Sequence, residues 1–133
     1  MELVESGKLK LNKSIDEKVT YHDACYLGRH NGEYEAPRKV INSVLKDGKL
    51  IEMERNRKDS FCCGAGGGNM WYDIEDGERI NSVRFQEAID TGVDVVATAC
   101  SFCTIMMDDA LKVKGKEDSM QVLDIAEMVA AAL

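Results

Sequence analysis

Five cysteines carry the most specific chemical signal in this chain of 133 residues. Cys62 and Cys63 are adjacent, Cys100 and Cys103 form a Cys-x-x-Cys pair, and Cys25 stands apart from both. Adjacent cysteines are poor disulfide partners for each other, because the bond between neighbours is strained. Two adjacent sulfurs suit a third group that accepts both, and a polynuclear metal centre is the obvious candidate.

A glycine-rich run follows the adjacent cysteines directly, over residues 64–68. Glycines let the backbone lie close to a bulky group and permit turns with positive φ. We therefore expect Gly64 and Gly66 to help bind a cofactor, with backbone N–H groups that approach its sulfur atoms and tune its potential.

Four kinds of chemistry are compatible with these thiols. An iron–sulfur cluster uses thiolates as its usual ligands, and the pKa of Cys103 should be lowered by its place in the first turn of a helix. Zinc in a closed structural site needs four cysteines and leaves the fifth unexplained. Thiol–disulfide exchange at Cys100 and Cys103 leaves Cys62 and Cys63 without a role. A phosphate-binding loop at 64–68 lacks the Lys-Ser/Thr of a Walker A motif. The cluster is favoured, with zinc as the alternative.

The overall composition excludes several classes of function. With 44% hydrophobic and 31% charged residues, the chain is typical of one soluble globular domain. A net charge of −7 argues against nucleic acid as a partner, because phosphate neutralisation needs clustered Lys and Arg. No apolar run reaches the ~18–20 residues of a membrane span, and no signal sequence opens the chain. Unpaired cysteines in such a chain indicate metal or redox chemistry in the reducing cytoplasm.

The elements that must position the cysteines alternate between strand and helix. Runs rich in β-branched residues predict strands at 18–22, 49–53, 93–99 and 121–123. Apolar periodicity and capping residues predict helices from Pro37 to Asp47, from Asp73 or Asp76 to about Asp90, from Ser101 onward, and from the capping box at Asp124 and Glu127 to Leu133. The helix after Ser101 is expected to bury Phe102, Ile105, Met106, Ala110 and Val113. This order predicts an α/β fold with about four mostly parallel strands flanked by helices.

The predicted strands explain how distant cysteines could meet. Cys25 follows the first strand, Cys62 and Cys63 follow the second, and Cys100 follows the third. The carboxyl ends of parallel strands lie at one edge of a sheet, which is where ligands bind in such folds. We therefore expect all five thiols at that edge.

Residues 1–17 are interpreted as a connector and residues 18–133 as the cysteine-rich domain. Glu2 to Ser6, followed by Gly7, has the pattern of a last helical turn with its C-cap glycine. We expect this turn to end an upstream helix, which would make the chain the C-terminal piece of a longer protein.

The cysteine pattern and its surroundings resemble the cysteine-rich CCG domain. The residues that carry the resemblance are His22-Asp23-Ala24-Cys25-Tyr26-Leu27-Gly28-Arg29-His30-Asn31, Glu54-Arg55-Asn56-Arg57, the stretch 61–71, and Ala97-Thr98-Ala99-Cys100. That domain occurs in the B and D subunits of heterodisulfide reductase, in the iron–sulfur subunit of glycolate oxidase and in related iron–sulfur oxidoreductases. Residues 18–133 look like its C-terminal copy.

The resemblance implies a noncubane [4Fe–4S] cluster bound by the five motif cysteines, which correspond one for one to Cys25, Cys62, Cys63, Cys100 and Cys103. It also implies electron transfer within a larger oxidoreductase, of which this chain is an incomplete component. The implied partners are ferredoxin-like and flavoprotein subunits or domains, and a membrane quinone-reducing subunit that would hold the protein at the inner face of the membrane. The competing interpretation is a zinc-binding or metal-free interaction module without a redox role.

Three departures from the family pattern leave the ligands intact. The family often has proline where Ala24 and Ser101 stand, and arginine where Asn69 stands. No catalytic residue is assigned, and His22 and His30 are the candidates. His22 could donate a hydrogen bond to the cluster or move protons, or it could simply end a strand. His30 could dock an anionic substrate or pack within its loop, and Trp71 could shield the cluster or anchor the core.

Overall fold

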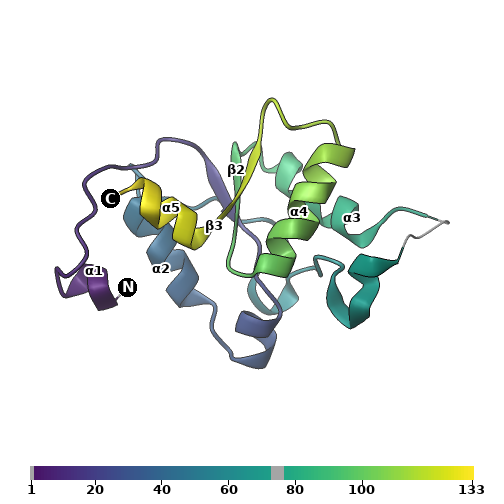
Figure 1. Ribbon diagram of the computed structural model, residues 1–133, viewed down its shortest axis with the longest axis horizontal. Coiled ribbons are helices and arrows are strands. Elements are labelled where there is room, and N and C mark those ends of the chain that lie inside the picture. Colours follow the sequence, from purple (N-terminus) through teal and green to yellow (C-terminus); the bar gives the residue numbers. More distant parts are fainter. Residues whose placement is uncertain (1, 73–76) are drawn as a thin grey trace.

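The computed structural model describes residues 2–72 and 77–133. Within them, three parallel strands form a central sheet with helices on both faces (Figure 1). The strands are β1 (Val19–Tyr21), β2 (Val95–Thr98) and β3 (Gln121–Asp124). The α-helices are α1 (Glu2–Glu5), α2 (Glu35–Val44), α3 (Ile80–Asp90), α4 (Ser101–Val113) and α5 (Ile125–Ala131). A π-helical turn η1 (Tyr26–His30) and two 3₁₀ segments, η2 (Arg57–Asp59) and η3 (Gly66–Trp71), complete the fold.

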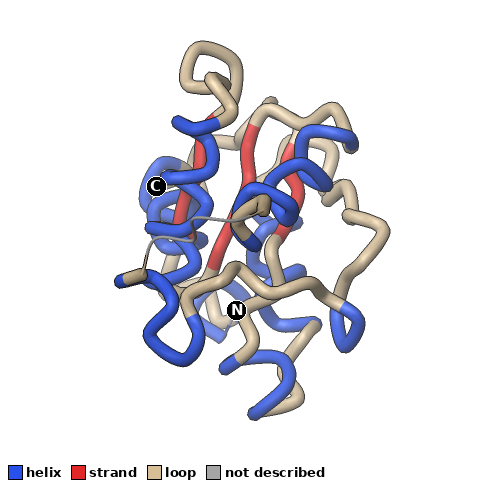
Figure 2. Tube along the Cα trace, turned by 90° about the vertical axis from the view of Figure 1, so that its right-hand side faces the viewer, coloured by secondary structure: helices blue, strands red, loops and turns tan. Residues whose placement is uncertain are grey.

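The strands are ordered β1-β2-β3, and Figure 2 shows them side by side. Val19 pairs with Val95, and Val95 pairs with Gln121, so that all three strands run in the same direction. The predicted α/β fold with a parallel sheet is confirmed. The predicted number of strands is wrong, because the run at 49–53 does not join the sheet.

In the segment 49–53, side chains form hydrogen bonds with backbone groups that a strand would use to pair with its neighbour. One backbone hydrogen bond, from Ile51 to the Val19 carbonyl at 2.9 Å, links this described segment to β1. The Leu50 N–H donates instead to the Asn42 side chain, and the Met53 carbonyl accepts from the Asn56 side chain. The segment therefore runs beside β1 as an extended chain without a ladder of hydrogen bonds.

Alternate residues of β2 enter two separate hydrophobic cores. Val95 and Ala97 face α2 and α5, whereas Val96 faces α3 and α4. Figure 1 shows these two pairs of helices on opposite sides of the sheet. The alternation follows from the two-residue period of a strand, and burial on both faces explains why this segment is almost continuously apolar.

The helix α4 buries a different face from the predicted one. Cys103, Met106, Met107, Ala110 and Leu111 are its buried residues, so that the predictions for Met106 and Ala110 hold. The other three predicted core residues, Phe102, Ile105 and Val113, are exposed. Because α4 is apolar around much of its circumference, its sequence does not reveal which face meets the sheet.

The helix α3 begins at Ile80, later than either predicted cap, and Asp73 and Asp76 lie outside the described residues. Its buried face is partly polar and includes Arg84, which a search for apolar periodicity does not find. The capping box of α5 is confirmed, because Asp124 accepts from the Ala126 N–H and Glu127 accepts from the Asp124 N–H, both at 2.8 Å.

The N-terminal segment packs against the end of the chain. Gly7 follows α1 with φ of +70°, as a C-cap glycine does. The Asn12 N–H then donates to the Ala132 carbonyl at 2.8 Å. Leu11 and Ile15 pack against the core beneath α2 and α5.

Candidate metal centre

All five cysteines line a single cavity of about 630 Å³. Cys25 lies just beyond β1, and Cys100 lies between β2 and α4. Cys62 and Cys63 reach the cavity from the loop after η2, and not from the end of a strand as predicted. The expected meeting of the cysteines at this edge of the fold is nevertheless observed, and all five are free thiols.

The cysteines occupy different depths in the cavity. Cys25 is exposed, Cys62 and Cys100 are half-buried, and Cys63 and Cys103 are buried. The two buried residues belong to the core beneath α3 and α4, so the floor of the cavity is part of that core.

A pair of hydrogen-bonded sulfurs forms this floor. The Cys103 thiol donates to the Cys63 sulfur at 3.4 Å, and a ring nitrogen of His22 lies within 4.8 Å of both sulfurs. The hydrogen bond from Cys103 lowers the pKa of Cys63 despite burial, and His22 lowers it further. The same hydrogen bond, together with burial, raises the pKa of Cys103. The predicted lowering of the Cys103 pKa is wrong, because its hydrogen bond with Cys63 and its burial both favour the protonated thiol.

The two candidate glycines differ in their surroundings. The Gly64 N–H donates to the Cys62 sulfur at 3.2 Å. Its φ is +88°, and a Cβ at this position would lie 3.2 Å from Cβ of Ile80. Gly66 lines the cavity itself, and no described atom lies within 4 Å of the position that its Cβ would take. A close backbone approach to sulfur is therefore seen at Gly64.

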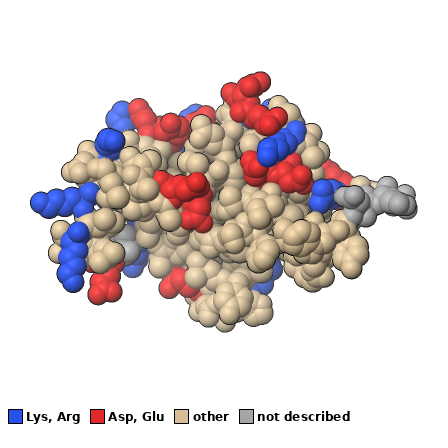
Figure 3. Space-filling view, viewed as in Figure 1, with Lys and Arg blue, Asp and Glu red and all other residues tan. Residues whose placement is uncertain are grey.

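Aromatic side chains stand at the rim of the cavity. Tyr26, Trp71 and Phe102 line it, with exposed fractions of 73%, 78% and 53%. Trp71 is therefore not a core anchor, which was one of its two expected roles. Figure 3 shows few charged side chains over the surface below α4 in this view. Ala24 and Leu27 also line the cavity, so the surroundings of the thiols are mainly apolar.

The two histidines lie in different environments. His22 is buried and accepts a hydrogen bond at Nδ1 from Nε of Arg84, at 3.0 Å. Burial lowers the pKa of His22, although the nearby Cys63 acts in the opposite direction. His30 is exposed, and its ring centroid lies 5.7 Å from that of Tyr26. His22 is therefore the histidine that contacts the thiols.

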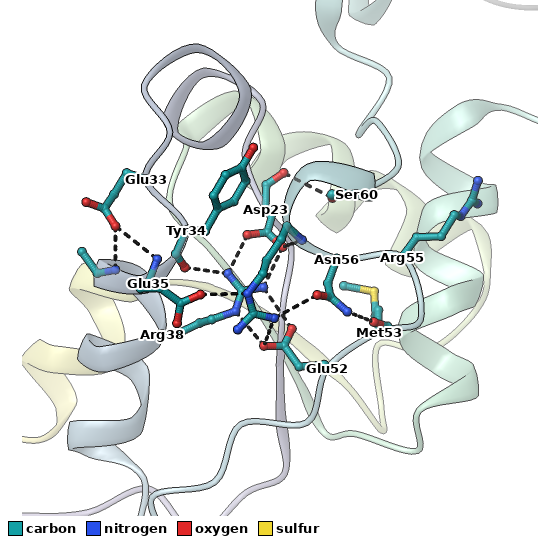
Figure 4. Close-up of polar contacts among 12 residues, drawn as sticks. Asp23, Glu33, Tyr34, Glu35, Arg38, Glu52, Met53, Arg55, Asn56 and Ser60 are labelled. Carbon is teal, nitrogen blue, oxygen red and sulfur yellow. Dashed lines mark hydrogen bonds and ion pairs between the residues drawn. The ribbon is translucent and has the colours of Figure 1, made fainter.

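A buried ion-pair network fastens the segments that carry Cys25 (Figure 4). Arg38 of α2 donates to both carboxylate oxygens of Asp23, at 2.7 and 2.8 Å, and also to Glu52. Asp23 accepts in addition from the backbone N–H of Arg57 at 2.8 Å. The end of β1, the helix α2 and the loop that leads to Cys62 are thereby held together.

Two arginines of this region were not found from the sequence. Arg84 is fully buried and Arg38 is 3% exposed. Arg38 shares its helix face with apolar residues, which is a signal in the sequence, whereas the buried face around Arg84 is partly polar and gives none. Ser60, immediately before the loop of Cys62, accepts from both Arg84 and Arg29.

Comparison with known proteins identifies the family of this fold and site. The sequence model of the cysteine-rich domain, CCG, matches residues 19–108, and the chain belongs to this family. No solved structure matches the chain.

Curated relatives are similar over nearly all of this chain. It is 40% identical to the Bacillus subtilis protein named probable iron-sulfur-binding oxidoreductase FadF, over 99% of this chain and 19% of that relative. It is 41% identical to the EtfAB:quinone oxidoreductase of Syntrophomonas wolfei, over 98% of this chain and 19% of the relative. It is 40% identical to a subunit of the dihydromethanophenazine:CoB–CoM heterodisulfide reductase of Methanosarcina acetivorans, over 99% of this chain and 32% of the relative. The chain thus spans 19% to 32% of the length of these relatives.

Within residues 2–72 and 77–133, no helix is both long and apolar enough to cross a membrane.

Proposed function

We propose that this chain is an iron–sulfur-cluster-binding electron-transfer domain of a larger, heterodisulfide-reductase-like oxidoreductase. The proposed ligands of a noncubane [4Fe–4S] cluster are Cys25, Cys62, Cys63, Cys100 and Cys103. The observation that carries this proposal is the convergence of five free thiols, from three separate segments, on one cavity. When bound, such a cluster would accept and pass on electrons.

The donor set fits a cluster better than it fits zinc. Thiolates are the usual ligands of iron–sulfur clusters, whereas a closed zinc site needs only four donors in a tetrahedral arrangement. Five sulfurs along a cavity of about 630 Å³ exceed what one tetrahedral ion requires. The hydrogen bond from Gly64 to the Cys62 sulfur would stabilise a thiolate ligand.

Residues of this chain would also control access to the centre. Ala24, Leu27 and Met70 line the cavity with apolar groups, which limits water around the sulfurs. Cys25 is the exposed ligand, so electrons would enter and leave near the mouth. Neither His22 nor His30 is assigned a catalytic role.

The proposed partners are other redox domains or subunits. The relatives named as an EtfAB:quinone oxidoreductase and as a heterodisulfide reductase subunit support a flavoprotein or ferredoxin-like donor and a quinone-reducing acceptor. A cytoplasmic location, with contact to the inner face of the membrane through such a partner, would keep the thiols reduced. We also retain residues 18–133 as the domain and 1–17 as its connector, which is supported by the start of the family match at residue 19.

The test is anaerobic purification followed by iron, sulfide and zinc analysis and by EPR. We expect a brown protein with about four iron and four sulfide per chain, and Cys62→Ser should lose most of both. Ser119→Ala, at an exposed position, serves as the control and should retain them. A colourless protein with one zinc, and without iron after reconstitution, would support the zinc alternative and overturn the proposal.

A further inference from the structure

His22 is a buried side chain with a ring nitrogen within 4.8 Å of the sulfurs at the floor of the cavity, and its hydrogen bonding determines where its proton lies. Nε of Arg84 lies 3.0 Å from Nδ1 of His22. A guanidinium has only donors, so Nδ1 must be the unprotonated nitrogen that accepts. A neutral imidazole in this position carries its proton on Nε2.

The ring of His22 also lies close to the sulfurs. The sulfurs of Cys63 and Cys103 and one nitrogen of His22 all lie within 4.8 Å of one another. Because Arg84 occupies Nδ1, the Nε2–H group is the one available to the Cys63 sulfur. The Cys103 thiol already donates a hydrogen bond to the Cys63 sulfur, so Cys63 is the sulfur that accepts hydrogen bonds at this site.

Arg84 itself is held by contacts from several directions. It is fully buried, donates to the Arg55 carbonyl at 2.9 Å and to the Ser60 hydroxyl at 3.2 Å, and forms an ion pair with Glu87. The carboxylate of Glu87 is shared between Arg84 and Arg55. Arg84 contacts His22 and is not among the residues that line the cavity, so its influence on the thiols acts through His22.

We propose that Arg84 is a positioning residue that locks His22 in its Nε2–H tautomer, and that His22 donates this hydrogen to the Cys63 sulfur and raises the reduction potential of the centre. The second part depends on the proposed function, because it requires a cluster at these thiols. A hydrogen bond to a ligand sulfur stabilises the additional negative charge of the reduced state. Loss of the hydrogen bond should lower the potential while all five ligands remain.

The first experiment needs no cluster and uses the reduced, metal-free chain labelled with ¹⁵N-histidine. The sequence contains two histidines, so the exposed His30 is an internal reference. We expect His22 to show a protonated Nε2 and an unprotonated Nδ1, and we expect this preference to weaken in Arg84→Lys. A protonated Nδ1 in the native chain would overturn the tautomer lock.

The second experiment measures the potential by anaerobic EPR titration of the reconstituted chain. His22→Leu should keep its iron and sulfide but show a roughly tenfold lower ratio of reduced to oxidised centre at a fixed potential, equivalent to about 59 mV for one electron. His22→Gln, whose amide N–H can replace Nε2–H, should recover part of the shift. Arg84→Lys should also lower the potential, and the double variant should fall no further than His22→Leu.

The outcomes separate this proposal from the proposed function. Unchanged potentials in fully loaded His22→Leu, additive shifts in the double variant, or a strong ¹⁵N hyperfine coupling that marks His22 as an iron ligand would each overturn the hydrogen-bond role. A native chain without any iron–sulfur centre would overturn the proposed function and the second part. The tautomer measurement would still support or overturn the first.

Discussion

The guanidinium of Arg38 donates to both carboxylate oxygens of Asp23, at 2.7 and 2.8 Å, and both side chains are buried (Figure 4). Asp23 stands two residues before Cys25. This ion pair therefore fixes the chain between the end of β1 and Cys25. Its integrity should matter for both stability and site geometry.

Arg38→Met should strongly destabilise the protein, because it leaves the Asp23 carboxylate buried without its partner. Removing one member of a buried pair costs about 3–5 kcal/mol, which urea denaturation of the metal-free chain would measure. Lys112→Met, which breaks the exposed pair with Asp108, is the control and should cause no measurable change. Equal effects of the two changes would contradict the burial of the Asp23 pair.

Gly64→Ala and Gly66→Ala should have different effects although the glycines are two positions apart. At Gly64, φ of +88° and the contact with Ile80 should cost about 1–3 kcal/mol and displace the N–H from the Cys62 sulfur. Gly66→Ala meets open space and should be nearly neutral. Denaturation midpoints and iron content measure both effects, and a larger loss in Gly66→Ala would argue against this loop geometry.

Met107→Ala should cost about 2–5 kcal/mol, because Met107 is 1% exposed and its truncation leaves a cavity in the core. Ile105→Ala, in the same helix, should cost less than about 1 kcal/mol, because Ile105 is 53% exposed. Chemical denaturation of both variants checks the orientation of α4. The opposite ranking would favour the face predicted from the sequence.

The rates at which the metal-free chain reacts with iodoacetamide should follow the depth of each thiol. The exposed Cys25 should react first, and the buried Cys63 and Cys103 should react last, because burial keeps the reagent away even from Cys63, whose pKa is lowered. Peptide mass spectrometry at successive times measures this order. Reconstitution with iron and sulfide should protect all five cysteines, whereas protection limited to four would favour zinc.

A strand could be predicted from the sequence where a β-type residue pattern also has a neighbouring strand with which to pair. The segments that became β1, β2 and β3 are short runs with β-branched residues, and each finds a parallel neighbour. The run at 49–53 has the same pattern, but Asn42 and Asn56 capture its backbone groups, and contacts of this kind are invisible in the sequence. The buried face of α4 was missed for a related reason. The helix is apolar around much of its circumference, so its packing partners decide which face is buried.

The candidate site was predictable as a set of residue types. Cysteines are rare enough for their spacing to be informative, and all five reach one cavity. Arg84 and Arg38 were missed because a buried arginine and a surface arginine look identical in a sequence. Their burial depends on acceptors such as His22 and Asp23, which come from distant positions in the chain.

The origin of the thiols in three segments has a consequence for the lifetime of the protein. Thirty-six residues separate Cys25 from Cys62, and thirty-six separate Cys63 from Cys100. A centre bound by all three segments would close two loops, and a covalent cross-link around a loop of this size removes about 4 kcal/mol of chain entropy from the unfolded state. Oxygen or a chelator that destroyed the centre would release this constraint. Damage to the cofactor would then also expose the polypeptide to unfolding and proteolysis.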